Sequence, residues 1–176
     1  VAVLKETGIV DCTGTKQVFK ADDEIFETIE YDYEILLNRF REQAFLNAGV
    51  RIVFSDKRDT ENIRTETLHY EGGIKSFVAH LNSLKNSELT HPDVVYFCCE
   101  ENGNQVEVAL QYTESYSETV LSFANNIHTP EGGTHENGFR LAMTRVFNDY
   151  GRKYGLLKEA DKNLSGEDVR EGITAV

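Results

Sequence analysis

Three arginines at helical spacing are the residues of this 176-residue chain whose positions most suggest a binding role. Arg140 and Arg152 belong to a series of polar side chains spaced by four residues, and Arg145 lies beside that series. Because an α-helix turns by about 100° per residue, these side chains are expected to share one face. Such a cationic face is a local reversal of sign, since the formal net charge of the chain is −12.

The element expected to position these arginines is a long helix from Asn137 to Tyr154, which follows a strand and a loop containing Pro130 and two glycines. Its apolar residues recur at three- and four-residue steps, which is typical of a helix that packs one side on a core. We therefore expect the apolar side to be buried and the arginine side to be open. The apolar stripe consists of Phe139, Ala142, Met143, Val146, Phe147, Tyr150 and Tyr154.

The composition restricts the classes of partner. A sequence pI of about 4.8 means that the whole chain repels DNA and anionic membranes, so any nucleic-acid contact must come from a local basic face. No apolar run approaches the roughly 18 residues of a membrane span, and no signal-peptide pattern opens the chain. We expect a cytoplasmic protein without a membrane partner.

The cysteines and histidines predict no metal site. Cys12, Cys98 and Cys99 are an odd number, and the adjacent pair lies in an apolar strand, so buried thiols in a reducing compartment are expected instead of disulfides. No CxxC or HxxxH spacing is present. The scattered histidines are expected to be satisfied surface or half-buried side chains; they are His69, His80 and His91.

The remaining pattern predicts an α+β fold. Three adjacent antiparallel strands are expected to precede the long helix, with a hairpin turn at Asn102-Gly103. Thr13-Gly14-Thr15 fits a β-turn, and it also fits a hydroxyl directed at a ligand. The expected elements are a strand, turn and strand over residues 1–30, a helix over 31–47, a strand over 50–54, a short helix from Ile74, strands over 94–99, 105–112 and 118–125, a capped helix from Ser165, and a strand over 173–176.

Catalytic motifs are missing from the sequence. It contains no P-loop, no dinucleotide-binding glycine pattern, no HExxH and no GxSxG. We therefore assign no catalytic residue to this chain.

Several longer runs resemble one family. They are similar to the B subunits of DNA gyrase, which are the ATPase subunits of bacterial type II DNA topoisomerases, and also to the paralogous ParE subunit of topoisomerase IV. The resemblance extends over essentially the whole chain. The runs are Tyr70–Ile74, Val106–Tyr112, Asn125–Ile127, Glu131–His135, Gly138–Arg140 and Leu164–Gly172.

The resemblance implies a division into two domains. Residues 1–72 would be the C-terminal part of a GHKL ATPase domain, and residues 73–176 a transducer domain of the ribosomal-protein-S5 domain 2-like fold, truncated at its C-terminus. Thr15 matches a nucleotide-binding threonine of the family. The family's catalytic Glu, magnesium-binding Asn and γ-phosphate lysine would lie outside the chain. The full-length subunit would use ATP and Mg²⁺, whereas this chain alone is expected to bind neither and to be inactive.

The resemblance also gives the arginines a role. Transducer domains of the family line the cavity that holds a captured DNA segment, and Arg140 matches an arginine of that wall; Arg145 and Arg152 extend it by helical spacing. The implied partners are DNA, the gyrase A subunit, and a second B subunit in an A2B2 heterotetramer, which couples ATP hydrolysis to negative supercoiling. Two alternatives stay open. The arginines could pair with carboxylates of the chain, and the chain could be an acidic stand-alone protein-binding module without catalytic activity.

Overall fold

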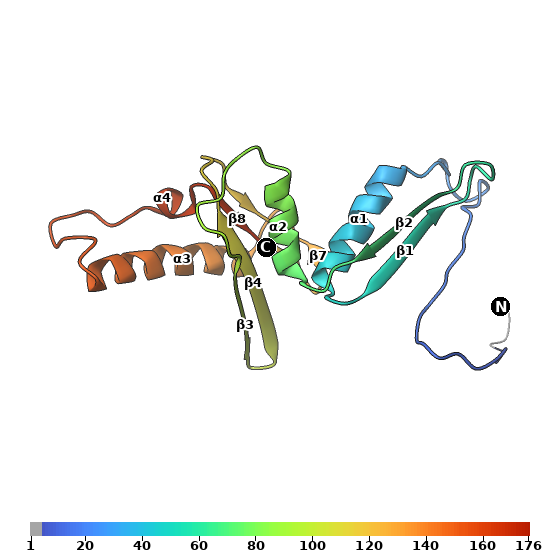
Figure 1. Cartoon of the computed structure of the whole chain (residues 1–176), viewed down its shortest axis with the longest axis horizontal. Helices are drawn as coiled ribbons and strands as arrows, with labels where there is room; N and C mark the ends of the chain where they lie inside the picture. Colours follow the sequence, from blue (N-terminus) through green and yellow to red (C-terminus); the bar gives the residue numbers. More distant parts are fainter. Residues whose placement is uncertain (1–4) are drawn as a thin grey trace. The chain divides into compact units, whose positions relative to one another are not determined.

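The computed structural model describes residues 5–176, and the chain divides into two units. The first unit ends at Asp32, and the second comprises Tyr33–Val176 (Figure 1). All helices and strands of the described residues belong to the second unit. The predicted domain boundary between residues 72 and 73 lies inside this second unit and stays a prediction.

Residues 5–32 contain neither helix nor strand, so the predicted strand, turn and strand are wrong for this segment; Val1–Leu4 lie outside the described residues. Its apolar side chains are largely exposed, as Ile9 and Phe19 are at 96% and 72%. A two-stranded hairpin is marginal in water unless an apolar face packs on another layer. Residues 5–32 of the described chain contain no such layer.

The second unit begins with a helix that packs on a two-stranded ribbon. Helix α1 (Tyr33–Leu46) covers β1 (Arg51–Asp56) and β2 (Arg64–His69), which pair antiparallel. Apolar side chains of α1 are buried against the ribbon, with Leu37 and Leu68 in one cluster. The helix and the first strand were both predicted, and both are confirmed.

Phe45 joins this ribbon to the next helix. Its side chain is 1% exposed, and its ring stacks on Tyr70 with a centroid distance of 3.7 Å and on Phe77 at 4.7 Å. Phe77 belongs to the predicted short helix, α2 (Ile74–Ser83). Because aromatic rings bury a large area in a fixed geometry, this stack holds the end of α1 against α2.

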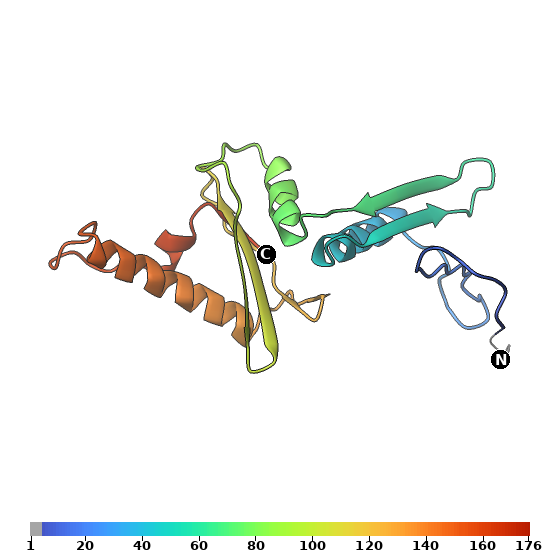
Figure 2. The same cartoon turned by 60° about the horizontal axis from the view of Figure 1, so that its bottom comes forward.

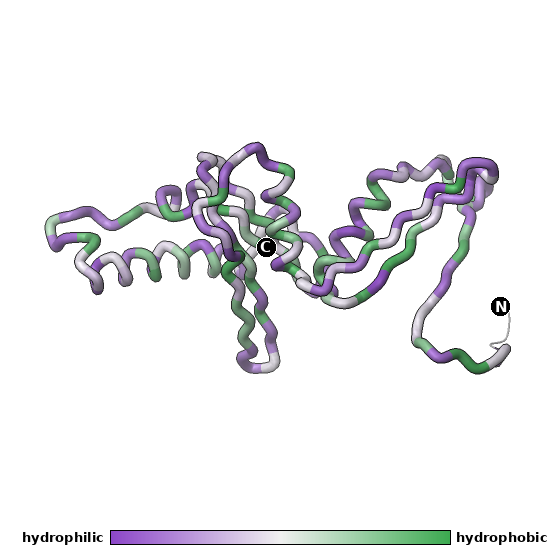
Figure 3. The backbone as a smooth tube through the Cα atoms, viewed as in Figure 1, coloured by the Kyte–Doolittle hydropathy of each residue, from purple (hydrophilic) through white to green (hydrophobic). Residues whose placement is uncertain are grey.

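A four-stranded sheet follows, in the order β3-β4-β8-β5. It contains β3 (Val95–Glu101), β4 (Asn104–Tyr112), β5 (Thr119–Val120) and β8 (Ile173–Ala175). The β3–β4 hairpin turns at Asn102 and Gly103, which both have positive φ, as predicted. Figure 3 shows hydrophobic residues along both arms of this hairpin and hydrophilic residues at its turn.

The prediction of three adjacent antiparallel strands is wrong. Strand β8 lies between β4 and β5, and it pairs antiparallel with β4 but parallel with β5. The expected strand over 118–125 is also broken, because only β5 and β6 (Phe123–Ala124) are extended and β6 pairs with β7 (Ile127–His128). The three residues of β8 are all buried, so this apolar segment fills the middle of the sheet better than the partly polar residues 118–122.

The two faces of the sheet are covered by different helices. Ala109 packs with Ile74 and Val78 of α2, whereas the neighbouring Leu110 packs with Phe139 at the start of α3 (Thr134–Lys153). Because successive strand residues point to opposite faces, α2 and α3 lie on opposite sides of the sheet (Figures 1 and 2). The fold is therefore α+β, as predicted.

A short helix, α4 (Gly166–Arg170), precedes β8. Its start was predicted from Ser165 and Asp168. Each side chain accepts a hydrogen bond from the other residue's backbone N–H, so the predicted capping box is confirmed. Among residues 5–176, no helix is long and apolar enough to span a membrane.

The prediction of buried thiols is wrong. Cys12, Cys98 and Cys99 are free and exposed. Cys98 and Cys99 lie in β3, the edge strand of the sheet, where every residue is exposed. An apolar strand at a sheet edge lacks the second neighbour that would cover its side chains, and the sequence pattern does not distinguish it from a central strand.

Candidate functional site

Helix α3 carries all three predicted DNA-contacting arginines, and it begins directly after two glycines. Gly132 and Gly133 have φ values of +72° and +151°, which residues other than glycine rarely adopt. They turn the chain into the first helical turn, whose acidic residue is Glu136. A carboxylate there is favoured by the positive end of the helix dipole. Arg140 follows Glu136 by one turn.

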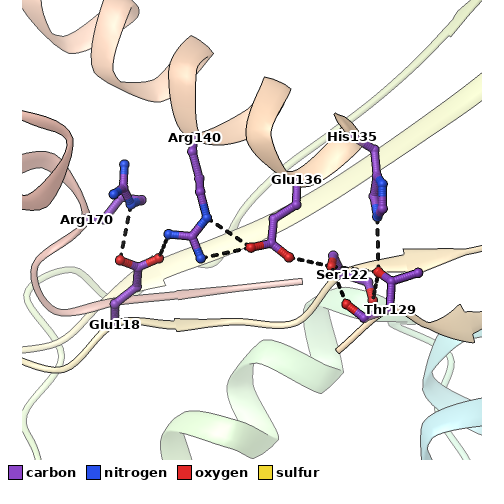
Figure 4. Close-up of polar contacts among 7 residues, drawn as sticks. All are labelled: Glu118, Ser122, Thr129, His135, Glu136, Arg140 and Arg170. Carbon is purple, nitrogen blue, oxygen red and sulfur yellow. Dashed lines mark hydrogen bonds and ion pairs between the residues drawn. The ribbon is translucent and has the colours of Figure 1, made fainter. Parts of the chain in front are cut away.

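Arg140 is held between two carboxylates (Figure 4). Its Nε donates to Glu136 Oε1 at 3.0 Å and its Nη2 lies 2.9 Å from the same oxygen, while its Nη1 pairs with Glu118. The second oxygen of Glu118 accepts from Arg170 Nε at 3.1 Å. Two arginines and two glutamates thus compensate one another, and the Arg140 side chain is only 29% exposed. The alternative that this arginine pairs with carboxylates is confirmed.

The same network continues from Glu136 toward the β6–β7 hairpin (Figure 4). Ser122 Oγ donates to Glu136 Oε2 at 2.6 Å, and Thr129 Oγ1 donates to the backbone oxygen of Ser122 at 2.8 Å. His135 Nε2 lies 3.1 Å from Thr129 Oγ1. The Ser122 hydroxyl is the main cause that lowers the pKa of Glu136 below its ordinary value of 4.5, and Arg140 adds to it. Glu136 is therefore a carboxylate at neutral pH.

Arg152 performs a different task at the other end of α3. Its guanidinium donates to the backbone oxygens of Lys158 and Asp161, the latter at 2.6 Å, and to Asn163 Oδ1 at 2.8 Å. These acceptors belong to the connection between α3 and α4. Arg152 therefore fastens this connection to the helix.

Arg145 is the exposed member of the three. Among residues 5–176 its side chain has no hydrogen-bond or ion-pair partner. It follows Arg140 by five residues, which places it about 140° around the helix from that paired side chain. Its guanidinium is free to bind an anion without first breaking a contact.

The predicted orientation of α3 is therefore wrong. Arg140 and the buried Asn148 face the rest of the unit, whereas Val146, Tyr150 and Tyr154 of the predicted apolar stripe are 56%, 56% and 58% exposed. Phe139 and Met143 of the stripe pack on the sheet, and the ring of Phe147 lies 6.3 Å from that of Tyr112 in β4. The polar face turns inward because its side chains satisfy backbone groups and carboxylates of neighbouring segments, which the helical periodicity does not reveal.

Several members of the network were not predicted. The Glu136–Arg140 pair has i,i+4 spacing on one helix and could have been found from the sequence. Glu118 and Arg170 are 52 residues apart, and nothing in the sequence indicates their contact. Thr15, the predicted nucleotide contact, is exposed in the first unit, and its role stays a prediction.

Metal-ligating side chains do not cluster in the described part of the chain. No group of three or more metal-ligating side chains occurs among residues 5–176. A hollow of about 300 Å³ lies beside the start of α2. Its polar groups satisfy one another, because Tyr96 donates to Glu107 at 3.2 Å and Lys75 lies over the Tyr96 ring.

Sequence comparisons identify relatives of this chain. The family model described as DNA gyrase B matches residues 73–176. The DNA gyrase B subunit of Clostridium acetobutylicum is 54% identical over 98% of this chain and 26% of the relative. The Bacillus mycoides protein is 54% identical over 99% of this chain and 43% of its own length. The Staphylococcus aureus protein is 52% identical over 98% and 27%. The chain thus spans less than half the length of these relatives.

Solved structures agree with these matches. A crystal structure of the 43K ATPase domain of Thermus thermophilus gyrase B in complex with an aminocoumarin has a TM-score of 0.74 at 33% identity. The gyrase B subunit of Myxococcus xanthus has a TM-score of 0.71 at 28% identity. Each comparison covers 88% of this chain and 41% of the other. The resemblance noted in the sequence is confirmed, and the chain belongs to the DNA gyrase B family.

Proposed function

We propose that this chain is a segment of the ATPase subunit of a bacterial type II DNA topoisomerase, a DNA gyrase that introduces negative supercoils by ATP-dependent double-strand passage. The observation that carries the proposal is the family match over residues 73–176 together with 54% identity to a gyrase B relative over nearly the whole chain. The activity is that of the full-length protein. The chain by itself, without the family's catalytic groups, is expected not to hydrolyse ATP.

The proposed division of labour follows the predicted domains. Residues 1–72 would complete the ATPase domain, where Thr15 would contact the nucleotide and Mg²⁺ would accompany ATP. Residues 73–176 would be the transducer, which passes the nucleotide state to the DNA. The Thr15 hydroxyl is exposed and therefore accessible to a ligand.

The proposed DNA contacts lie on α3. Arg145 is the strongest candidate, because its guanidinium is exposed and unpaired among the described residues. To bind a phosphate, Arg140 would have to break its ion pair with Glu118 or Glu136. Arg152 would have to break its hydrogen bonds to backbone oxygens. Contacts from arginine to phosphate are independent of sequence and sensitive to salt. They suit a protein that must hold a duplex without reading it.

The proposed partners are those of the family. The full-length protein would assemble with the gyrase A subunit, and with a second copy of itself, into an A2B2 heterotetramer that acts on DNA in the cytoplasm. Its relatives of 52–54% identity are named as B subunits of DNA gyrase, which supports this assembly.

A chimaera tests the proposed activity. The matching segment of the Clostridium acetobutylicum relative is replaced by this chain, and the resulting protein is mixed with the gyrase A subunit of the same organism. We expect ATP-dependent supercoiling of relaxed plasmid. A folded chimaera that hydrolyses no ATP and leaves the plasmid relaxed would instead favour an acidic protein-binding module.

The same chimaera tests the DNA contact. Arg145→Glu is expected to weaken duplex binding at every sequence and to lower the slope of log K against log salt concentration by about 1 or more. Lys153→Glu, a charge reversal near the end of the same helix, is the control for a general change in charge. Equal effects of the two substitutions would count against a specific contact at Arg145.

A further inference from the structure

The β6–β7 hairpin contacts two helices that are far apart in the sequence. At its tip, Gln43 Nε2 of α1 donates to the backbone oxygen of Asn126 at 2.9 Å. The side chain of Asn126 donates to Asn47 Oδ1, just beyond the end of α1, also at 2.9 Å. Two hydrogen bonds therefore hold the tip against the end of α1, and the hairpin lies beside that helix end in Figures 1 and 2.

The base of the hairpin contacts the first turn of α3 instead. Ser122 donates to Glu136 at 2.6 Å, and Thr129 lies 3.1 Å from His135 (Figure 4). From Glu136 the contacts pass to Arg140, and from Arg140 to Glu118. The same short hairpin thus touches α1 at one end and the arginine-bearing helix at the other.

The hairpin is built to be stiff. Asn125 and Asn126 have φ values of +49° and +63°, which is the pair of positive angles required by the tight turn that matches strand twist. The ladder continues past the strands, because Thr129 N donates to Ser122 O at 2.8 Å. Three residues separate Ser122 from Asn126, and the first two of them, Phe123 and Ala124, form strand β6.

Polar contacts, more than burial, set the position of this hairpin. Ile127 is 63% exposed, and the apolar contact of Phe123 with Phe77 of α2 has a centroid distance of 6.3 Å. An element with little buried surface follows the groups to which it is hydrogen-bonded. A displacement of the end of α1 is therefore passed to the start of α3.

We propose that the β6–β7 hairpin is a strut that fixes α3 relative to α1, with Asn126 and Ser122 as its positioning residues. The functional consequence of the strut rests on the proposed function. When α1 moves with the nucleotide state of the ATPase domain, the strut would move α3, the helix proposed to face DNA. We assign neither residue a contact with nucleotide or DNA. Each acts by holding another element in place.

Asn126→Gly is the informative substitution at the tip. Glycine adopts positive φ without strain, so the variant removes only the side-chain contact with Asn47. Asn125→Gly is its matched control, because Asn125 also has positive φ and its side chain has no hydrogen bond among the described residues. At the base, Ser122→Ala removes the hydroxyl and Ser122→Thr retains it.

Hydrogen exchange of the 176-residue chain tests the strut without reference to function. Asn126→Gly and Ser122→Ala are expected to raise amide exchange in the first turns of α3, over residues 137–141, by several-fold relative to Asn125→Gly and Ser122→Thr. Equal exchange in Asn126→Gly and Asn125→Gly would overturn the proposal, whatever the chimaera does.

The chimaera mixed with the gyrase A subunit tests the functional consequence. We expect Asn126→Gly and Ser122→Ala to keep the rate of ATP hydrolysis and to lower the number of supercoils introduced per ATP several-fold, with Ser122→Thr restoring it. If hydrolysis and supercoiling fall in parallel, the residues serve stability only and the coupling role is rejected. A parent chimaera without ATP-dependent supercoiling rejects the proposed function, and the exchange data alone then decide on the strut.

Discussion

The side-chain amide of Asn148 pairs with the backbone of Leu164 as a neighbouring strand would. Its Nδ2 donates to Leu164 O at 3.0 Å, and its Oδ1 accepts from Leu164 N at 2.8 Å. The Asn148 side chain also donates to Thr144 O, one turn back on α3, at 2.8 Å. The Asn148 side chain on α3 thereby satisfies the backbone N–H and C=O of Leu164, which has no neighbouring strand to pair with.

Replacing Asn148 by alanine is expected to destabilise the protein by about 1–3 kcal/mol, because it leaves a donor and an acceptor of Leu164 without their partners. Asn137→Ala on the same helix is the control, since Asn137 is exposed and its side chain has no hydrogen bond among the described residues. Urea unfolding followed by circular dichroism measures both variants. If the Asn148→Ala and Asn137→Ala variants are equally stable, water replaces the Asn148 amide at Leu164 without loss of stability.

Gly172 should tolerate no side chain. Its φ is +74°, and a Cβ at this position would lie 2.3 Å from Thr113 O and 2.7 Å from Ser115 O. Gly155 has a similar φ of +70°, but a Cβ built on Gly155 would meet no atom within 4 Å. A substitution at Gly155 therefore measures the cost of the backbone conformation alone. Alanine at position 155 is expected to cost about 1–2 kcal/mol.

Alanine at position 172 should cost about 3 kcal/mol or more, because β4 and the start of β8 must separate to admit the methyl group. Thermal unfolding of the two variants side by side gives the difference. If Gly172→Ala melts at the same temperature as Gly155→Ala, the close approach of the Thr113 carbonyl does not exist in solution.

The pKa of Glu136 predicts a loss of stability in acid. Ser122 and Arg140 favour the carboxylate in the folded state, so the folded pKa lies below the unfolded one. The stabilisation is complete above the ordinary value of 4.5 and is lost as the pH falls through the folded pKa. Glu136→Gln should lower stability at pH 7 by about 1–2 kcal/mol and flatten the decline of stability as the pH falls below the ordinary pKa of 4.5.

Glu131→Gln provides the matched control, since Glu131 is exposed in the turn just before α3 and has no hydrogen-bond or ion-pair partner in the described chain. Unfolding free energies measured at half-unit pH steps distinguish the two variants. If the unfolding free energy of the Glu136→Gln variant falls with pH as steeply as that of the parent, other carboxylates cause the acid sensitivity.

Local signals in the sequence predicted local structure. The turn at Asn102-Gly103, the cap at Ser165 and the helix over residues 31–47 each depend on residues within a few positions of one another, and each is confirmed. The pairing of Thr119 with Thr174 joins residues more than 50 positions apart, and the insertion of β8 between β4 and β5 followed no local pattern.

The site was predicted less well than the fold. The sequence correctly placed the three arginines on one helix, but it did not give the direction in which Arg140 and Arg152 point. That direction depends on Glu118 and on the backbone of residues 158–164, which approach α3 only in the folded chain. The family resemblance indicated a DNA-facing helix, and the structure adds that Arg145 is the arginine left exposed on it.

The exposed thiols of β3 should react in the native protein. Cys98 and Cys99 lie on opposite faces of the edge strand, and both are exposed, as is Cys12. A chromogenic disulfide reagent is expected to modify three thiols per chain without denaturant, and the same number in urea. Because the side chains pack against little, Cys98→Ser and Cys99→Ser should each change stability by less than about 0.5 kcal/mol. Fewer than three reactive thiols in the native chain, combined with a loss above about 1 kcal/mol in one serine variant, would place that cysteine in a covered position.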